Sequence, residues 1–189
     1  NKQMTNKLPK LLAMATFFVA LVAVFTVLNT SQASAATINV TTNDVSPVAN
    51  ADGCTLREAI ENINNQAQTN TDCAAGDGNN DTITIPNGTI TLQADLPQIT
   101  TSMTIQGAGM GETVISGNAG IHGLFSNQPA ATDTFMLNGL TLTSYHFFAL
   151  LSLQGNVGLN QVEIDGTGSL FDSGPGSFSG AIAVQNPTA

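Results

Sequence analysis

The pattern of apolar and polar positions divides the chain into three parts. Residues 11–28 are an apolar run broken only by two threonines. Residues 54–64 carry apolar side chains at positions i, i+3, i+4 and i+7, which predicts an amphipathic helix. From residue 82 onward, threonine and isoleucine or leucine alternate in short runs, which predicts β-strands. The apolar positions of the predicted helix are Leu56, Ala59, Ile60 and Ile63.

The predicted helix has a clear start signal. Thr55 followed by Glu58 is a capping box, in which the hydroxyl accepts from the amide three residues on and the carboxylate reaches back. A short alternating strand at 37–41 precedes the helix, and polar loops at 43–53 and 66–81 flank it. A lone short helix ahead of a long β region is interpreted as a cap.

The same residues carry a resemblance to a known family. Cys54-Thr55-Leu56-Arg57-Glu58-Ala59 resembles the Cys-Ser-Leu-Arg-Glu-Ala motif that names the CSLREA domain, with threonine in place of serine. The similarity continues through Cys73 and the segments 81–90 and 104–109, and covers roughly residues 38–120 closely. It implies a secreted or cell-surface bacterial protein with a right-handed parallel β-helix of the pectin lyase-like fold. It implies no particular reaction.

An internal repeat supports stacked coils of a β-helix. The apolar and asparagine positions of 135–142 match those of 157–164 at an offset of 22 residues. Asn138 then lies over Asn160, where side-chain amides can form a hydrogen-bonded ladder. A weaker match aligns 151–154 with 182–185.

These observations predict an all-β solenoid, a right-handed parallel β-helix with a short N-terminal capping helix. An antiparallel sandwich of short strands is the alternative. It explains the alternation of apolar and polar residues, but it does not explain an offset that aligns an asparagine.

The N-terminus has the order of a secretory signal. Lys7 and Lys10 precede the apolar run, and the small residues Ala33-Ser34-Ala35 follow it. We therefore expect residues 1–35 to be removed and the mature chain to begin at Ala36. Because the run is near the lower length limit for a membrane span, an uncleaved anchor is the alternative.

Charge narrows the choice of partners. The basic residues are Lys2, Lys7, Lys10 and Arg57, and only Arg57 follows the leader, whereas all 13 acidic residues do. The mature chain therefore carries a formal net charge of −12. Such a chain cannot neutralise phosphates, which excludes nucleic acid and argues against anionic membrane surfaces. A carbohydrate or a host or cell surface is the partner we expect.

Two cysteines remain after the leader. In an exported chain, an even number without metal-like spacing favours a disulfide between Cys54 and Cys73, with two free thiols as the alternative. The bond would close a loop over the helix and contribute about 3 kcal/mol by restricting the unfolded chain.

One segment suggests a cofactor. Asp77, Asn79 and Asp81 place oxygen ligands at alternate positions, as at the start of a calcium loop. However, Thr82 stands where an EF-hand needs glycine, and Gly88 where it needs glutamate. A series of Asx turns leading into a strand is the alternative. The sequence suggests no other cofactor.

Three segments follow: a signal peptide at 1–35, a CSLREA-like cap at 36–81, and the first coils of a β-helix at 82–189, with the chain expected to continue further. We expect a secreted or cell-surface structural or adhesion-type module without catalytic residues in this segment. The alternative is a polysaccharide lyase or glycoside hydrolase whose site lies further along the chain. A lyase acting on an acidic glycan needs cations, and Arg57 is the sole mature one.

Overall fold

A computed structural model describes a large part of the chain after residue 33. The described residues are 34–42, 53–117, 123–127, 133–145, 148–152, 155–165, 169–172 and 178–185. The basic residues and apolar run of the predicted leader, and most of the predicted loop at 43–53, lie outside them.

One helix and eleven strands occur in the described residues. In chain order they are β1 (Thr37–Asn39), α2 (Leu56–Asn65), β2 (Asp81–Thr84), β3 (Gly88–Thr91), β4 (Met103–Gln106), β5 (Thr113–Ser116), β6 (Gly123–Asn127), β7 (Thr134–Thr143), β8 (Phe148–Ser152), β9 (Asn156–Asp165), β10 (Ser169–Asp172) and β11 (Phe178–Gln185).

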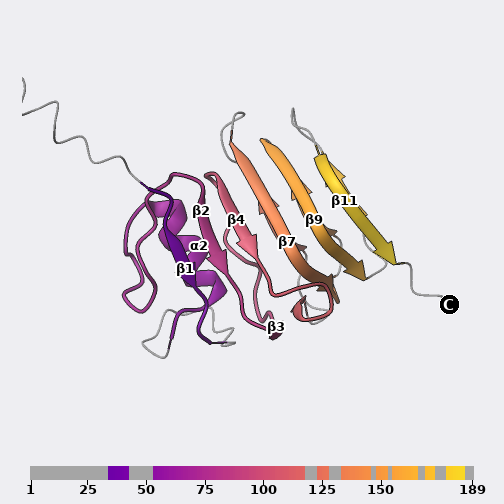
Figure 1. Cartoon of the computed structure of the whole chain (residues 1–189), viewed down its shortest axis with the longest axis horizontal. Helices are drawn as coiled ribbons and strands as arrows, with labels where there is room; N and C mark the ends of the chain where they lie inside the picture. The colour runs from indigo at the N-terminus through magenta and orange to yellow at the C-terminus, as the bar shows by residue number, and fades with distance from the viewer. Residues whose placement is uncertain are drawn as a thin grey trace, which may run out of the picture. The chain divides into compact units, whose positions relative to one another are not determined.

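The described strands form two sheets in which every pairing is parallel. The larger sheet has eight strands, in the path β1-β2-β4-β7-β5-β3, with β9 joined to β7 and β11 joined to β9. Figure 1 shows β2, β4, β7, β9 and β11 side by side. The smaller sheet has the order β10-β8-β6. Because the described pairings are all parallel, the antiparallel sandwich is excluded for these strands.

The prediction of a right-handed parallel β-helix with a pectin lyase-like fold is wrong. The eight-stranded sheet is open, and in the described residues neither sheet closes on itself or winds into a solenoid. The number of residues between paired strands also varies along the sequence. Ile83 pairs with Ile105, 22 residues later, whereas Ile38 pairs with Ile83, 45 residues later. A repeated offset identifies neighbouring strands, but it does not make the sheet coil.

The main repeat is confirmed as strand register, and the weaker one is wrong. β7 and β9 pair with Asn138 opposite Asn160, at the predicted offset. Asn138 Oδ1 is buried and has no hydrogen-bond partner among the described residues, so this atom takes no part in the predicted amide ladder. In the weaker repeat, Leu151 pairs with Phe171 rather than with the segment beginning at Ile182, which pairs with β9.

A row of aliphatic side chains runs across the larger sheet and forms its core. Successive strands place these residues in register, from β1 through β2, β4 and β7 to β9. Each is at most 1% exposed. Parallel strands hold such side chains about 4.8 Å apart, so each buries its neighbours. The row consists of Ile38, Ile83, Ile105, Leu137 and Leu159.

The long strand β7 changes its pairing partner at Gly139. Residues before this glycine pair with β4, and residues after it pair with β5, so one strand borders two. Gly139 has φ 59°, a left-handed conformation that glycine adopts without a Cβ clash. The backbone at Gly107 also lies close to β7. A Cβ at position 107 would lie 2.3 Å from the Gly139 carbonyl oxygen, so this position needs a glycine.

Candidate functional site

The capping helix begins as predicted. Thr55 is the N-cap residue, and its hydroxyl accepts from the Glu58 amide at 3.2 Å. Glu58 Oε2 in turn accepts from the Thr55 amide at 3.0 Å. Both halves of the capping box are therefore present, and Glu58, at 2% exposed, is held inside the protein rather than in solvent.

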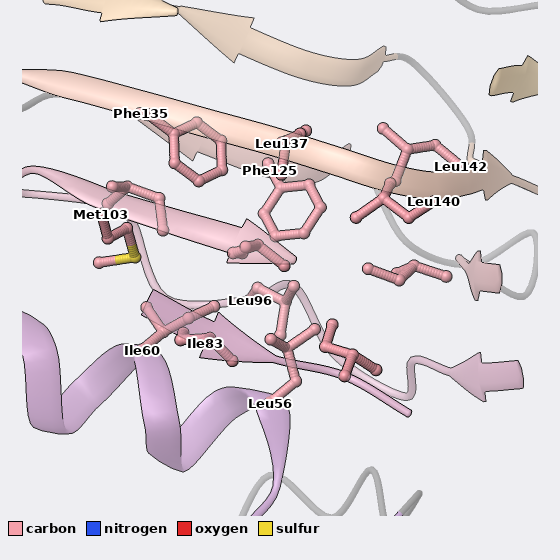
Figure 2. Close-up of a cluster of buried hydrophobic side chains, with 14 of the residues drawn as sticks. Leu56, Ile60, Ile83, Leu96, Met103, Phe125, Phe135, Leu137, Leu140 and Leu142 are labelled. Carbon is pink, nitrogen blue, oxygen red and sulfur yellow. The ribbon is translucent and has the colours of Figure 1, made fainter. Parts of the chain in front are cut away.

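The apolar stripe of α2 packs against the end of the larger sheet. All four predicted positions are buried. Figure 2 shows Leu56 and Ile60 pointing toward Ile83 of β2, with Met103 of β4 beyond, and Figure 1 places α2 beside β1 and β2. Fully burying side chains of this size stabilises by about 1.5–3 kcal/mol each. The helix is therefore fastened to the first strands of the sheet.

Cys54 and Cys73 form a disulfide in the structure. Their Cα atoms are 4.7 Å apart, and the bond links the residue before the N-cap to the loop after the helix. This is the pairing predicted from the sequence. Because disulfides persist in oxidising surroundings, the bond indicates that the protein resides in such an environment.

Asn62 organises the loop that follows the helix. Its side chain is 0% exposed, and Nδ2 donates to the Asn70 carbonyl at 3.0 Å and to the Ala74 carbonyl at 2.9 Å. Its Oδ1 accepts from the Asn70 amide at 2.7 Å. The Asn70 side chain then donates to Glu61 Oε2 at 3.0 Å. The Asn62 side chain therefore supplies hydrogen-bond partners to backbone groups of the loop that have none from a helix or a strand.

Sequence reasoning missed this residue. Glu58 and Asn62 lie one helical turn apart, so they share a face of α2. A polar face is normally assigned to solvent, but here the loop 67–76 covers it. The loop lies directly against the helix at Gly76, because a Cβ there would lie 2.5 Å from the Ile63 Cα.

Arg57 fastens the helix on another side. Its Nη2 donates to the Asp95 carbonyl at 2.5 Å and to the Ala94 carbonyl at 3.3 Å. Both acceptors are backbone carbonyls of the loop before β4. Glu61, one helical turn after Arg57, accepts a hydrogen bond from the Asn70 side chain. The single basic residue of the described ranges therefore has a structural role.

Of the predicted calcium residues, Asp77 and Asn79 lie in the turn before β2, and Asp81 is the first residue of β2. Asp81 is 0% exposed, and its carboxylate accepts three backbone amides: Ala36 at 2.8 Å on Oδ1, and Asp77 at 2.9 Å and Gly78 at 3.1 Å on Oδ2. Asp77 Oδ1 accepts from the Asn79 amide at 2.9 Å, which is an Asx-turn contact. This geometry supports the Asx-turn alternative, because a cation would have to compete with three amides for Asp81. Calcium binding stays a prediction.

Asp81 is expected to make stability depend on pH. Burial by itself raises the pKa of Asp81, but the amides of Ala36 and Gly78 and the contacts with Asp77 outweigh it, so the pKa lies below the ordinary 3.8. A carboxyl whose pKa is lower in the folded state stabilises the fold above the unfolded-state pKa. This contribution is lost as pH falls through the folded-state pKa. The free energy of unfolding should therefore decline between about pH 5 and pH 2.

Urea titrations of the wild type and of Asp81→Asn across this range measure the effect. The variant should be less stable at neutral pH, and the gap should narrow as the medium becomes acidic. Parallel profiles for wild type and Asp81→Asn would contradict the assignment.

A second acidic cluster adjoins the disulfide. Glu58, Asp72 and Cys73 each place one ligand-type atom within 4.8 Å of the others. Cys73 Sγ is bonded to Cys54, so it offers no thiolate. Glu58 Oε1 and Asp72 Oδ2 are buried without a hydrogen-bond partner in the described residues. The cluster is thus two desolvated carboxylate oxygens beside a disulfide.

A polar network also lies where β7 and β9 pair. Thr141 Oγ1 accepts from the Gly111 amide and donates to Glu163 Oε2, both at 2.9 Å. Nearby, Tyr145 is buried, and desolvation together with the Asp165 charge raises the pKa of its hydroxyl. A tyrosine of raised pKa stays protonated at neutral pH, so it is unsuited to act as a base there.

The one helix of the described ranges, α2, is not long and apolar enough to cross a membrane. Comparisons with protein-family models, curated proteins and solved structures find no match. The resemblance to the CSLREA domain therefore continues to rest on the residues quoted above.

Proposed function

We propose that this protein is a secreted or cell-surface structural module of the CSLREA type, in which residues 36–81 cap the end of a parallel sheet. The observation that carries this proposal is the construction of the cap. The apolar stripe of α2 is buried, a disulfide ties the start of the helix to the loop after it, and Arg57 and Asn62 donate to backbone carbonyls of two loops.

The cap also holds the exit of β1. The Val40 amide donates to the Thr84 carbonyl at 2.9 Å, which continues the pairing of β1 with β2. The Thr41 amide donates to the Cys54 carbonyl at 2.9 Å, and Thr41 Oγ1 accepts from the Cys54 amide at 2.9 Å. Exposed sheet edges pair readily with other chains. A clamped first strand protects the sheet from such pairing.

The polar groups of the cap favour a structural role over catalysis. Arg57 donates to two carbonyls, Asp81 accepts three amides, and Glu58 belongs to the capping box. Groups engaged in this way stabilise the fold, and moving them toward a substrate would break those bonds. The acidic mature chain also repels acidic polymers. A carbohydrate or a host or cell surface is the partner class we propose.

Two measurements test the function. The first is expression of the full chain in a bacterium with a Sec pathway, followed by N-terminal sequencing of exported protein, which should begin at Ala36. The second is incubation with polygalacturonate, alginate and a neutral glucan, with and without calcium, following unsaturated products and new reducing ends. No turnover is expected.

Arg57→Ala is the matched control for the second measurement. Activity that disappears in this variant, at an unchanged melting temperature, would overturn the structural proposal, because it would give the only mature cation a role at a substrate. Product that retains Lys7 and Lys10 would contradict export with cleavage.

A further inference from the structure

Asp81 is a buried charge for which the described residues supply no cation. Its three hydrogen-bond donors are backbone amides, those of Ala36, Asp77 and Gly78. The one basic residue of the described ranges, Arg57, donates to carbonyls elsewhere. Buried carboxylates are normally paired with a cation as well as hydrogen-bonded. Among the described residues, the Asp81 charge is therefore met by amide dipoles and not by a cation.

The donor on Oδ1 is the residue at which the mature chain is expected to begin. Ala36 N lies 2.8 Å from Asp81 Oδ1, although 45 residues separate the two in sequence. That distance falls in the range for a hydrogen bond between an ammonium and a carboxylate. The residues on the other side of the expected cleavage point, Ser34 and Ala35, are exposed.

We propose that removal of the leader between Ala35 and Ala36 creates a salt bridge between the new α-ammonium group of Ala36 and the Asp81 carboxylate, which locks β1 onto β2. This inference rests on the proposed export of the protein. Maturation would then complete the cap, because the cleavage that releases the chain also supplies the cation that Asp81 lacks.

The chemistry is hydrolysis of one peptide bond by a leader peptidase. The bond between the Ala35 carbonyl carbon and the Ala36 nitrogen breaks, and water supplies a hydroxyl to the Ala35 carboxyl and a proton to the Ala36 amine. At neutral pH the amine takes up one more proton from solvent and becomes an ammonium. The nitrogen keeps its donor contact with Asp81 and gains a full positive charge.

The surroundings keep the new terminus in place. The Ala36 carbonyl accepts from the Thr82 amide at 2.8 Å, so the residue is held by β2 after cleavage. Ala36 itself is half-buried, which limits the screening of the charge by water. Position and partial burial together make the ammonium face Asp81 rather than move freely in solvent.

Selective acetylation of the terminus tests the lock. The mature chain has no lysine, since Lys2, Lys7 and Lys10 all precede residue 36. Acetic anhydride therefore acetylates the α-amine as the only amine, restoring an uncharged amide at Ala36. Acetylation of the mature protein should raise the unfolding equilibrium constant about tenfold, as loss of a charge-assisted hydrogen bond does. Denaturant titration with intrinsic probes or circular dichroism measures this.

A cycle of variants assigns the effect to Asp81. In Asp81→Asn, acetylation should change the unfolding equilibrium constant far less. In Asp72→Asn, which alters another carboxylate near the same loop, the full effect should remain. The native α-amine should also react more slowly with the reagent than the amine of Asp81→Asn, because an ammonium bound to a carboxylate yields less neutral amine.

The outcomes separate this inference from the proposed export. A chain produced with a removable methionine before Ala36, and oxidised to form the disulfide, carries the same terminus whether or not cells export the protein. Equal stability of its free and acetylated forms, with Asp81 present, would overturn the lock. Export with cleavage at another bond would overturn the proposed maturation, while the acetylation result would still report on the ion pair.

Discussion

Asn62→Ala should destabilise the protein by about 3 kcal/mol, because buried backbone groups of the loop would lose their partners. Asn62 donates to the Asn70 and Ala74 carbonyls and accepts from the Asn70 amide, in a position without solvent access. The loop 67–76 cannot form a regular ladder to replace these bonds. The free energy of unfolding, from urea titration of the oxidised protein, measures the loss.

Asn65→Ala is the matched control, because Asn65 is on the same helix but exposed, with one bond to Thr69 Oγ1 at 3.1 Å. It should change stability by about 0.5 kcal/mol or less. Asn62→Asp is a sharper variant, since it keeps the size and the acceptor but removes the two N–H donors. If Asn62→Ala and Asn65→Ala were equally mild, the proposed role of Asn62 would be wrong.

Removing the disulfide is expected to cost about 3 kcal/mol, because the bond restricts a loop of about twenty residues in the unfolded chain. Cys54→Ser with Cys73→Ser, or reduction of the native protein, should lower the midpoint of denaturation. Non-reducing mass spectrometry should first show the two cysteine peptides linked in the exported protein. Free thiols at that stage would contradict the oxidising environment.

The control for this prediction is to find which residues lose protection from hydrogen exchange when the disulfide is reduced. Hydrogen exchange after reduction should increase more in residues 54–81 than in β7 and β9, because the disulfide closes only the first segment. The double serine variant should match the reduced protein. Uniform exchange across both regions would mean that the bond supports the whole fold and not the cap alone.

The cap helix could be read from the sequence because its signals are local. A capping box and an apolar stripe depend on residues three to seven positions apart, and one turn of helix brings them together. The chain therefore specified both where α2 begins and which side faces the sheet. The disulfide also followed, since a chain with two cysteines allows one internal pairing.

The sheet could be read only in part. The 22-residue offset predicted that β7 and β9 lie side by side, and the register is the predicted one. It could not show that the sheet stays open, because closure depends on loops whose lengths differ from strand to strand. The weaker offset failed for the same reason, as Leu151 and Ile182 belong to different sheets.

The polar centres of the cap were decided by the tertiary structure. Asn62 lies on the polar face of the predicted helix, and Asp81 was predicted as a calcium ligand or part of an Asx turn, yet both are 0% exposed. What buries them is chain from elsewhere: the loop 67–76 over Asn62, and Ala36 against Asp81 across 45 residues. The sequence by itself determined the helix and its cap, because those follow from short-range periodicity, and it determined the pairing of β7 with β9 through the 22-residue repeat. Which polar groups are enclosed depends on contacts between distant segments, and only the folded chain brings those together.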